Sequence, residues 1–131
     1  MNFFAAAACD LSCMENIKNI EETIRTYTSA WNETNRETIQ GIISRCWAEG
    51  GTYTDPLTDT ITGRNAITDL IISSYSQKGP RTFKVLGAPQ THHNRGRFRW
   101  LAIFPEGYPA EGMDYFEFDD DNRITRIVGF F

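Results

Sequence analysis

The sequence predicts one α+β domain in which N-terminal helices pack on a curved, mostly antiparallel sheet around a single pocket. The length of 131 residues suits one domain with a core of its own. Helical spacings of apolar residues fill the first third of the chain, whereas alternating apolar and polar residues follow in its second half. Helices followed by a run of long antiparallel strands are typical of the α+β class.

The first part of the chain is predicted to form helices. Thr34 and Glu37 form a capping box that predicts the start of a second helix, with Trp47 on its buried side and the glycine pair at residues 50–51 at its end. A third helix is predicted over residues 64–77. The first helix has its apolar residues at spacings of three and four, on one face: Ile17, Ile20, Ile24, Tyr27 and Trp31.

The rest of the chain is predicted as strands. Two short extended segments cover residues 51–56 and 60–63. A bulge is expected at residues 87–89, because a proline cannot donate to a central ladder, and a turn is expected at residues 94–96. The long strands are predicted over residues 81–93, 97–104, 112–119 and 123–131.

The composition is that of an ordinary globular protein. Hydrophobic residues make up 40% of the chain and charged residues 23%, and the net charge is −4. Among the basic residues only Arg95, Arg97 and Arg99 lie close together, so we expect no nucleic-acid partner. No apolar stretch is long enough to span a membrane, so we expect no membrane partner either.

The cysteines Cys9, Cys13 and Cys46 have no paired spacing. They predict neither a disulfide framework nor a zinc site, and they favour a reducing compartment, the cytoplasm. Residues 1–14 contain a short apolar run without a preceding basic residue, which is unlike a signal sequence. We interpret them as an N-terminal extension before a domain over residues 15–131. The alternative is a lipoprotein cleavage box, which the alanines ending at Cys9 resemble.

Asp114 is the first candidate for chemistry. It shares a strand face with Phe116 and Phe118, which alternation places in the interior. A carboxyl group buried there must be hydrogen-bonded or neutral. The alternative turns Tyr115 and Glu117 inward and leaves Asp114 in solvent, which would bury Glu117 and expose two phenylalanines.

Asp55 and Tyr27 are two further candidates. Asp55 ends a short strand before Pro56, where a carboxylate can face the mouth of a pocket. An Asp-Pro pair is also an ordinary turn signal, which is the alternative interpretation. Tyr27 lies in the apolar stripe of the first helix, so its hydroxyl needs a partner there, either a backbone carbonyl or a ligand.

Two histidines and several aromatic residues complete the candidate pocket. Successive strand residues point to opposite faces, so only one of His92 and His93 can face the interior. A two-residue turn would select His93 and a three-residue turn His92, and an ordinary half-buried histidine is the alternative. The sequence has no metal-ligand cluster, phosphate-binding loop or nucleophile motif, so no cofactor or metal is expected. Aromatic residues expected to contact the ligand are Trp31, Phe98, Trp100 and Phe116.

Several short motifs occur in a fixed order: YTSAWN from Tyr27, WAEGG from Trp47, Asp55-Pro56, GRNAI from Gly63, Trp100, GMDYF from Gly112, and a segment from Arg123 to Phe131. Together they resemble the SnoaL-like branch of the nuclear-transport-factor-2-like superfamily, from about Ile17 to Phe131. The resemblance implies a cone-shaped, cystatin-like fold around one deep, mostly apolar cavity. It also implies a homodimer formed through the sheet, which the outward-facing Leu101 and Ile103 favour.

Within this superfamily the pocket is most similar to that of the ketosteroid isomerases. In those enzymes a helix tyrosine and a strand aspartic acid form an oxyanion hole, and an aspartate in an Asp-Pro pair is the general base. The resemblance gives the first two roles to Tyr27 and Asp114 and the third to Asp55.

Other members keep a second hypothesis open. The histidine pair and Trp100 lie outside the isomerase pattern and are similar to an uncharacterised SnoaL-like subgroup. SnoaL-type polyketide cyclases act on polycyclic keto substrates without a cofactor, and the superfamily also contains non-catalytic binding proteins. The first hypothesis is therefore an isomerase- or cyclase-like enzyme acting on a small apolar carbonyl compound. The second is a non-catalytic protein that binds a small apolar ligand.

Overall fold

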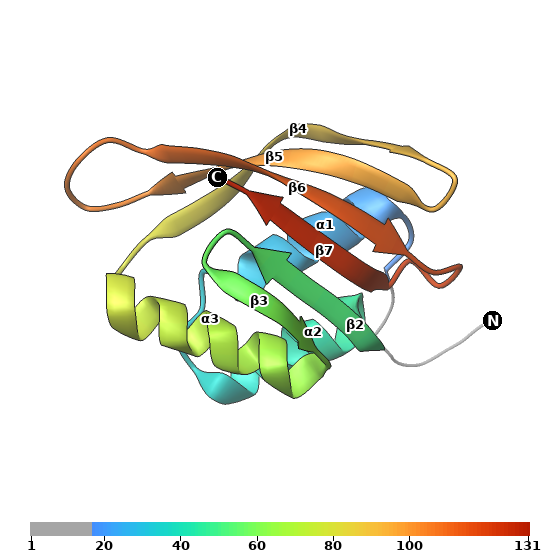
Figure 1. Cartoon of the computed structure of the whole chain (residues 1–131), viewed down its shortest axis with the longest axis horizontal. Coiled ribbons are helices and arrows are strands. Elements are labelled where there is room, and N and C mark those ends of the chain that lie inside the picture. The colour runs from blue at the N-terminus through green and yellow to red at the C-terminus, as the bar shows by residue number, and fades with distance from the viewer. Residues whose placement is uncertain (1–16) are drawn as a thin grey trace.

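The computed structural model describes residues 17–131, so the predicted extension over residues 1–14 lies outside the described residues. The α+β class is confirmed, with helices packed on a six-stranded sheet (Figure 1). In chain order the elements are α1 (Ile20–Ala30), α2 (Arg36–Cys46), β2 (Trp47–Asp55), β3 (Thr58–Thr62), α3 (Arg64–Lys78), β4 (Thr82–His92), β5 (Arg95–Ile103), β6 (Ala110–Phe118) and β7 (Ile124–Phe130).

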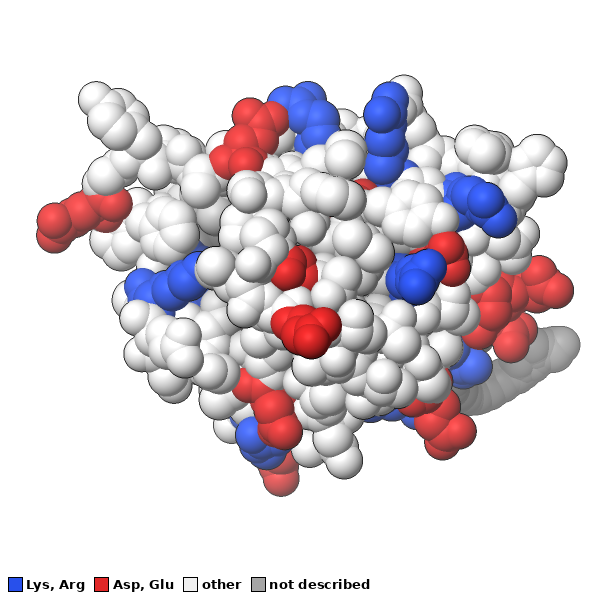
Figure 2. Space-filling view, in the orientation of Figure 1, with Lys and Arg blue, Asp and Glu red and all other residues white. Residues whose placement is uncertain are grey.

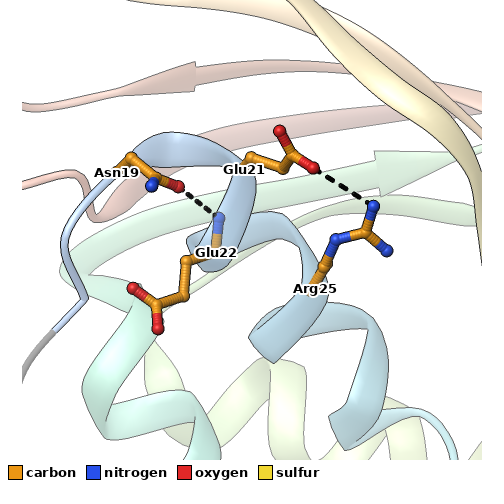
Figure 3. A network of polar contacts seen from close by, with 4 residues as sticks. All are labelled: Asn19, Glu21, Glu22 and Arg25. Carbon is orange, nitrogen blue, oxygen red and sulfur yellow. Dashed lines mark hydrogen bonds and ion pairs between the residues drawn. The ribbon is translucent and has the colours of Figure 1, made fainter.

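Helix α1 is held at its N-terminus by local polar contacts. The Asn19 side chain accepts a hydrogen bond from the backbone N–H of Glu22 at 2.8 Å (Figure 3). One turn further on, Arg25 pairs with Glu21 at 3.2 Å. The helix begun in this way buries Tyr27, whose ring stacks on an indole of β2.

Helix α2 differs from its prediction at both ends. The side chain of Asn35, not that of Thr34, caps it by accepting the backbone N–H three residues later at 3.0 Å. The helix ends at Cys46, and Trp47 begins β2 with a fully buried side chain, so its predicted helical placement is wrong. The nearby glycine makes room for this indole, because a Cβ at Gly51 would lie 2.5 Å from Trp47 Nε1.

The sheet has the strand order β3-β2-β7-β6-β5-β4. Strand β2 pairs with β7 in parallel, and every other pair is antiparallel. In the β5–β6 pair Phe98 lies opposite Asp114, and both side chains are buried, so the predicted inward face of β6 is confirmed. The predicted bulge of β4 is confirmed too, since the register with β5 shifts between Leu86 and Gln90.

The β4–β5 hairpin turns on His93 and Asn94, not on residues 94–96 as predicted. His92 pairs with Arg95, and the two turn residues have φ values of 50° and 60°. Two consecutive left-handed residues form the two-residue turn that matches the twist of the strands. The expectation that one histidine faces the interior is wrong, because residues 91–95 at this hairpin tip are all exposed.

The surface of the described chain mixes both signs of charge. On the face that Figure 2 shows, acidic and basic side chains are interspersed, and no continuous basic stripe crosses that face. Exposed ion pairs such as Arg36–Asp69, at 2.9 Å between α2 and α3, add little to stability. Within residues 17–131, no helix combines the length and the apolar character needed to cross a membrane.

Candidate active site

A cavity of about 360 Å³ lies between α1, α3 and the inner face of the sheet. Its volume falls in the range of sites for small molecules. Most of its wall is apolar, including Trp31, Leu70, Phe83, Phe98, Trp100 and Phe104. The titratable side chains in the wall are Tyr27, Tyr53, Asp55, Lys78, Arg81 and Asp114. Apolar walls with a few placed polar groups are typical of ligand sites.

Asp114 is the buried acid of this cavity, with 6% of the residue exposed. The indole Nε1 of Trp100 donates a hydrogen bond to its Oδ1 at 3.0 Å. Burial raises the pKa of Asp114 to about 7 against the opposing effect of this hydrogen bond, and the charge of Asp55 adds to the rise. Asp114 therefore keeps its proton up to near-neutral pH. Since the indole occupies Oδ1, the proton belongs on Oδ2, which can donate to a ligand.

Two glycines make room for this arrangement. Gly112 pairs with Trp100 across β5 and β6, and a Cβ at Gly112 would overlap the indole ring. Gly129 on β7 pairs with Asp114, and a Cβ there would lie 3.1 Å from Asp114 Oδ1 and 3.3 Å from Asp55 Cβ. The two aspartates thus flank the bare backbone of Gly129, which lets them share one part of the cavity wall.

Tyr27 is the second buried donor at this end of the cavity. Only 2% of the residue is exposed, and its ring stacks on that of Trp47 with 5.5 Å between centroids. Burial, and then the negative charge of Asp114, raises the pKa of Tyr27 well above its usual value, so the hydroxyl keeps its proton. Among the described residues no hydrogen bond joins Tyr27 to Asp114, whose side-chain partner is Trp100.

Asp55 ends β2 as a half-buried carboxylate held by two donors. The Tyr53 hydroxyl donates to its Oδ2 at 2.6 Å, and the backbone N–H of Leu57 donates to its Oδ1 at 2.8 Å. Burial raises the pKa of Tyr53 far above its usual value, so this hydroxyl remains a donor. Asp55 is the acceptor in both bonds, which fixes its orientation.

The structure separates the predicted site residues into two groups. Tyr27, Asp55 and Asp114 line the cavity together, and so do Trp31, Phe98 and Trp100. Phe116 does not line it but lies in the core, between Phe98 and Phe118 with 5.8 Å between ring centroids on each side. His92 and His93 lie at the hairpin tip outside the cavity, with 2.9 Å between their Nδ1 atoms.

Sequence reasoning missed Tyr53 and Arg81. Tyr53 stands two residues before Asp55 on one strand, so it shares a strand face with that carboxylate, and this signal could have found it. Arg81 directly precedes β4, two residues before the inward-facing Phe83, and the same alternation could have placed it inside.

Within residues 17–131, no group of three or more histidine, cysteine, aspartate or glutamate side chains could hold a metal ion. Cys46 is buried and free, and burial raises the pKa of its thiol to about 12. A thiol with so high a pKa is a poor nucleophile.

Comparison with known families supplies the identity of the domain. Residues 24–127 match the model of the SnoaL-like domain, which covers most of the chain. The chain belongs to the SnoaL-like family. No curated protein matches this SnoaL-like chain. A SnoaL-like protein of known structure from Agrobacterium tumefaciens, named as a proposed isomerase, is 32% identical with a TM-score of 0.75, over 82% of this chain and 92% of that one.

Two more distant structures share the fold of this SnoaL-like protein. One is a nuclear-transport-factor-2-like protein of unknown function from Exiguobacterium, 14% identical with a TM-score of 0.65, over 82% of this chain and 95% of that one. The other has a ketosteroid isomerase-like fold, comes from Catenulispora acidiphila and contains trimethylamine. It is 16% identical with a TM-score of 0.67, over 84% of this chain and 85% of that one.

The pKa of Asp114 predicts that stability falls as pH rises. The folded value of about 7 lies above the value of about 3.9 for an unfolded aspartate. The folded SnoaL-like protein thus keeps a proton that the unfolded chain has lost. The stabilisation is complete below about pH 4 and is lost as the pH rises to about 7, by about 1.4 kcal/mol per pH unit.

Urea unfolding at several pH values between about 5 and 8 measures this dependence. The matched variant is Asp114→Asn, whose amide does not titrate. The free energy of unfolding of the wild type should fall relative to that of the variant as the pH rises. A constant difference between the two proteins would contradict the raised pKa.

Proposed function

We propose that the protein is a cofactor-independent acid–base enzyme, of the isomerase or polyketide-cyclase type, acting on a small apolar carbonyl compound. The observation that carries this proposal is a buried carboxyl group and a buried tyrosine in the wall of one apolar cavity, both with a raised pKa. Membership of the SnoaL-like family and the likeness to a proposed isomerase agree with it.

Tyr27 and Asp114 have the properties of an oxyanion hole. Removing a proton next to a carbonyl group builds negative charge on the carbonyl oxygen, and fixed donors in a water-poor site stabilise that charge strongly. Both groups are buried; Tyr27 keeps its proton at neutral pH, and Asp114, with a pKa of about 7, keeps its proton in most molecules below neutral pH. The indole of Trp100 donates to Oδ1 of Asp114, which leaves the other oxygen of the carboxylic acid to donate to a ligand.

Asp55 is the proposed base. It is half-buried at the end of β2, and its two hydrogen bonds hold it in one orientation. Asp55 takes the proton from the carbon next to the carbonyl, and the C–H electron pair forms a C=C bond as the carbonyl π electrons move to oxygen. Where a second C=C bond makes the product a dienolate, protonated Asp55 returns its proton to the far carbon of that dienolate and completes an isomerisation. In a cyclisation the enolate carbon attacks a second carbonyl group, and protonated Asp55 gives its proton to the alkoxide that forms.

The second hypothesis, a non-catalytic binding protein, makes different demands on the cavity. It requires Tyr27 and Asp114 to satisfy each other or the backbone, with no reactive group open to a ligand. Both side chains instead line a cavity of about 360 Å³ and are not bonded to each other. This arrangement favours the enzyme, and binding without chemistry is an outcome of the experiments below.

The oxyanion hole predicts tight binding of phenols, because a bound phenolate imitates an enolate. Titration with phenols and naphthols of graded acidity should change the fluorescence of Trp31 and Trp100, which line the cavity. Affinity should fall at least tenfold in Asp114→Ala and in Tyr27→Phe, from the loss of a hydrogen bond to charge. The exposed Asp59 and Tyr108 supply the controls Asp59→Ala and Tyr108→Phe. Binding that is indifferent to the first two changes would point to a plain apolar carrier.

The proposed base predicts exchange of carbon-bound protons. Small cyclic enones bound in D₂O should incorporate deuterium next to the carbonyl, followed by NMR. Asp55→Asn should lower the exchange rate by about a hundredfold or more while the fold is kept, since general bases contribute about that much. Asp59→Asn is the control. An unchanged exchange rate in Asp55→Asn would remove Asp55 from the mechanism.

We also propose that two copies pair through the outer face of the sheet. The helices lie on the other side (Figure 1). An apolar patch that is exposed on the outer face of a sheet often marks a contact between proteins. The outer face carries half-buried side chains that point away from the cavity: Leu101, Ile103, Met113, Tyr115 and Val128.

Light scattering at micromolar concentration should give about twice the mass of one 15.0 kDa chain. Leu101→Glu should shift the mass toward a single chain, because it puts a charge in the proposed contact. Tyr108→Glu, in an exposed loop, is the control. The mass of one chain for the wild type would refute the dimer.

A further inference from the structure

Arg81 is a buried cation at the opposite end of the cavity from the aspartates. Only 9% of the residue is exposed, and it lines the cavity. Its guanidinium carbon stands 5.3 Å from the centre of the Tyr75 ring and 5.6 Å from that of Phe83. Stacking of this kind uses the flat sides of a guanidinium and leaves its edges for hydrogen bonds.

One edge of this guanidinium has no partner. Nη1 donates to the backbone oxygen of Gly79 at 3.4 Å, whereas Nε and Nη2 are buried without a hydrogen-bond partner among the described residues. No carboxylate of residues 17–131 forms an ion pair with Arg81. A buried cation left in this way is costly to the folded protein unless something else pairs with it.

The two unpaired nitrogens of Arg81 are on the same edge of the guanidinium. Nε and Nη2 lie on the same side of the guanidinium and form one of its two-pronged edges. This fork matches the two oxygens of a carboxylate in a pair of parallel hydrogen bonds. Lys78, in the last turn of α3, also lines the cavity and adds positive charge at this end.

We propose that Arg81 binds a carboxylate of the substrate, whose carbonyl group lies at the other end of the cavity against Tyr27 and Asp114. The substrate class is then an oxo acid with an apolar body, rather than a neutral ketone. The carbonyl half of this inference rests on the proposed function, whereas the carboxylate half rests on Arg81 alone.

The register of the sheet separates the two ends of such a substrate. Phe83, beside the guanidinium, lies opposite Ala102, and Asp114 lies opposite Phe98. The two levels are four residues apart on β5, about 13 Å at the usual rise of a strand. Phe83 and Trp100, whose rings are in contact, provide an apolar wall for the body of the substrate between the two levels.

A pair of matched probes tests the carboxylate. Para-hydroxyphenylacetate carries a phenol for the aspartate end and a carboxylate for Arg81, and para-hydroxyphenylacetamide differs only in lacking the charge. The wild type should bind the acid at least tenfold tighter than the amide, as expected for hydrogen bonds to a charged group. If the wild type binds the two probes equally well, or binds the amide more tightly, the inference is overturned by the wild-type protein alone.

The variants Arg81→Met and Arg81→Lys test the residue itself. Arg81→Met should abolish the preference for the acid, and Arg81→Lys, which keeps the charge but loses the fork, should retain only part of it. Arg97→Met, on the exposed part of β5 where Arg97 bonds to Gln90, should keep the full preference. A full preference in Arg81→Met would overturn the assignment to Arg81. If Arg81→Met does not fold, Arg81→Lys decides: an undiminished preference there overturns the proposed fork.

Neutral para-ethylphenol, measured in parallel, separates this inference from the proposed function. Its binding depends on the oxyanion hole and not on Arg81. One outcome is that the affinity for para-ethylphenol is unchanged in Tyr27→Phe and Asp114→Ala while the preference for the acid is lost in Arg81→Met. In that case the proposed function fails and the carboxylate site stands. If para-ethylphenol needs both donors while the acid gains nothing over the amide, the oxyanion hole stands and the carboxylate site fails.

Discussion

The site depends on one constraint: ionising the Asp114 carboxyl group in its buried position costs free energy. Its carboxyl group faces an apolar cavity, and burial raises its pKa to about 7. The surroundings fit this protonated form. The Trp100 indole supplies a donor to one oxygen, Gly112 gives the indole its place, and Gly129 leaves room beside the acid. A charged group here, or a side chain in place of either glycine, would disturb several of these contacts at once.

The cavity is polar at its ends and apolar between them. One end has a protonated acid and a carboxylate held by Tyr53, and the other end has a guanidinium with a free edge. Aromatic rings line the space between, from Phe83 to Trp100. A ligand with one polar group would leave one of these ends unsatisfied, whereas a ligand with two would be held in a single orientation. Orientation of this kind is what a proton transfer between fixed groups requires.

The sequence allowed the prediction of those features that follow from local periodicity. Alternation along β6 put Asp114 inside because two phenylalanines share its face, and the helical stripe of α1 put Tyr27 in the core. Tertiary contacts decided the rest. The spacing of Trp47 suits a helix as well as a strand, and its stacking on Tyr27 selects the strand. Alternation along β4 could have placed Arg81 inside, but the stacking of its guanidinium on Tyr75 of α3 is a contact between elements that alternation does not specify.

The place of β7 in the sheet affects when the site can form. Asp55 on β2 and Asp114 on β6 are neighbours only because β7 lies between their strands, with Gly129 at the meeting point. On a ribosome β2 and β6 emerge before β7, so the two aspartates remain apart until that strand has been made and inserted. Its parallel pairing with β2 joins residues far apart in the chain, a contact that forms slowly. The pocket that the two carboxyl groups share therefore cannot form before β7 has been synthesised and paired.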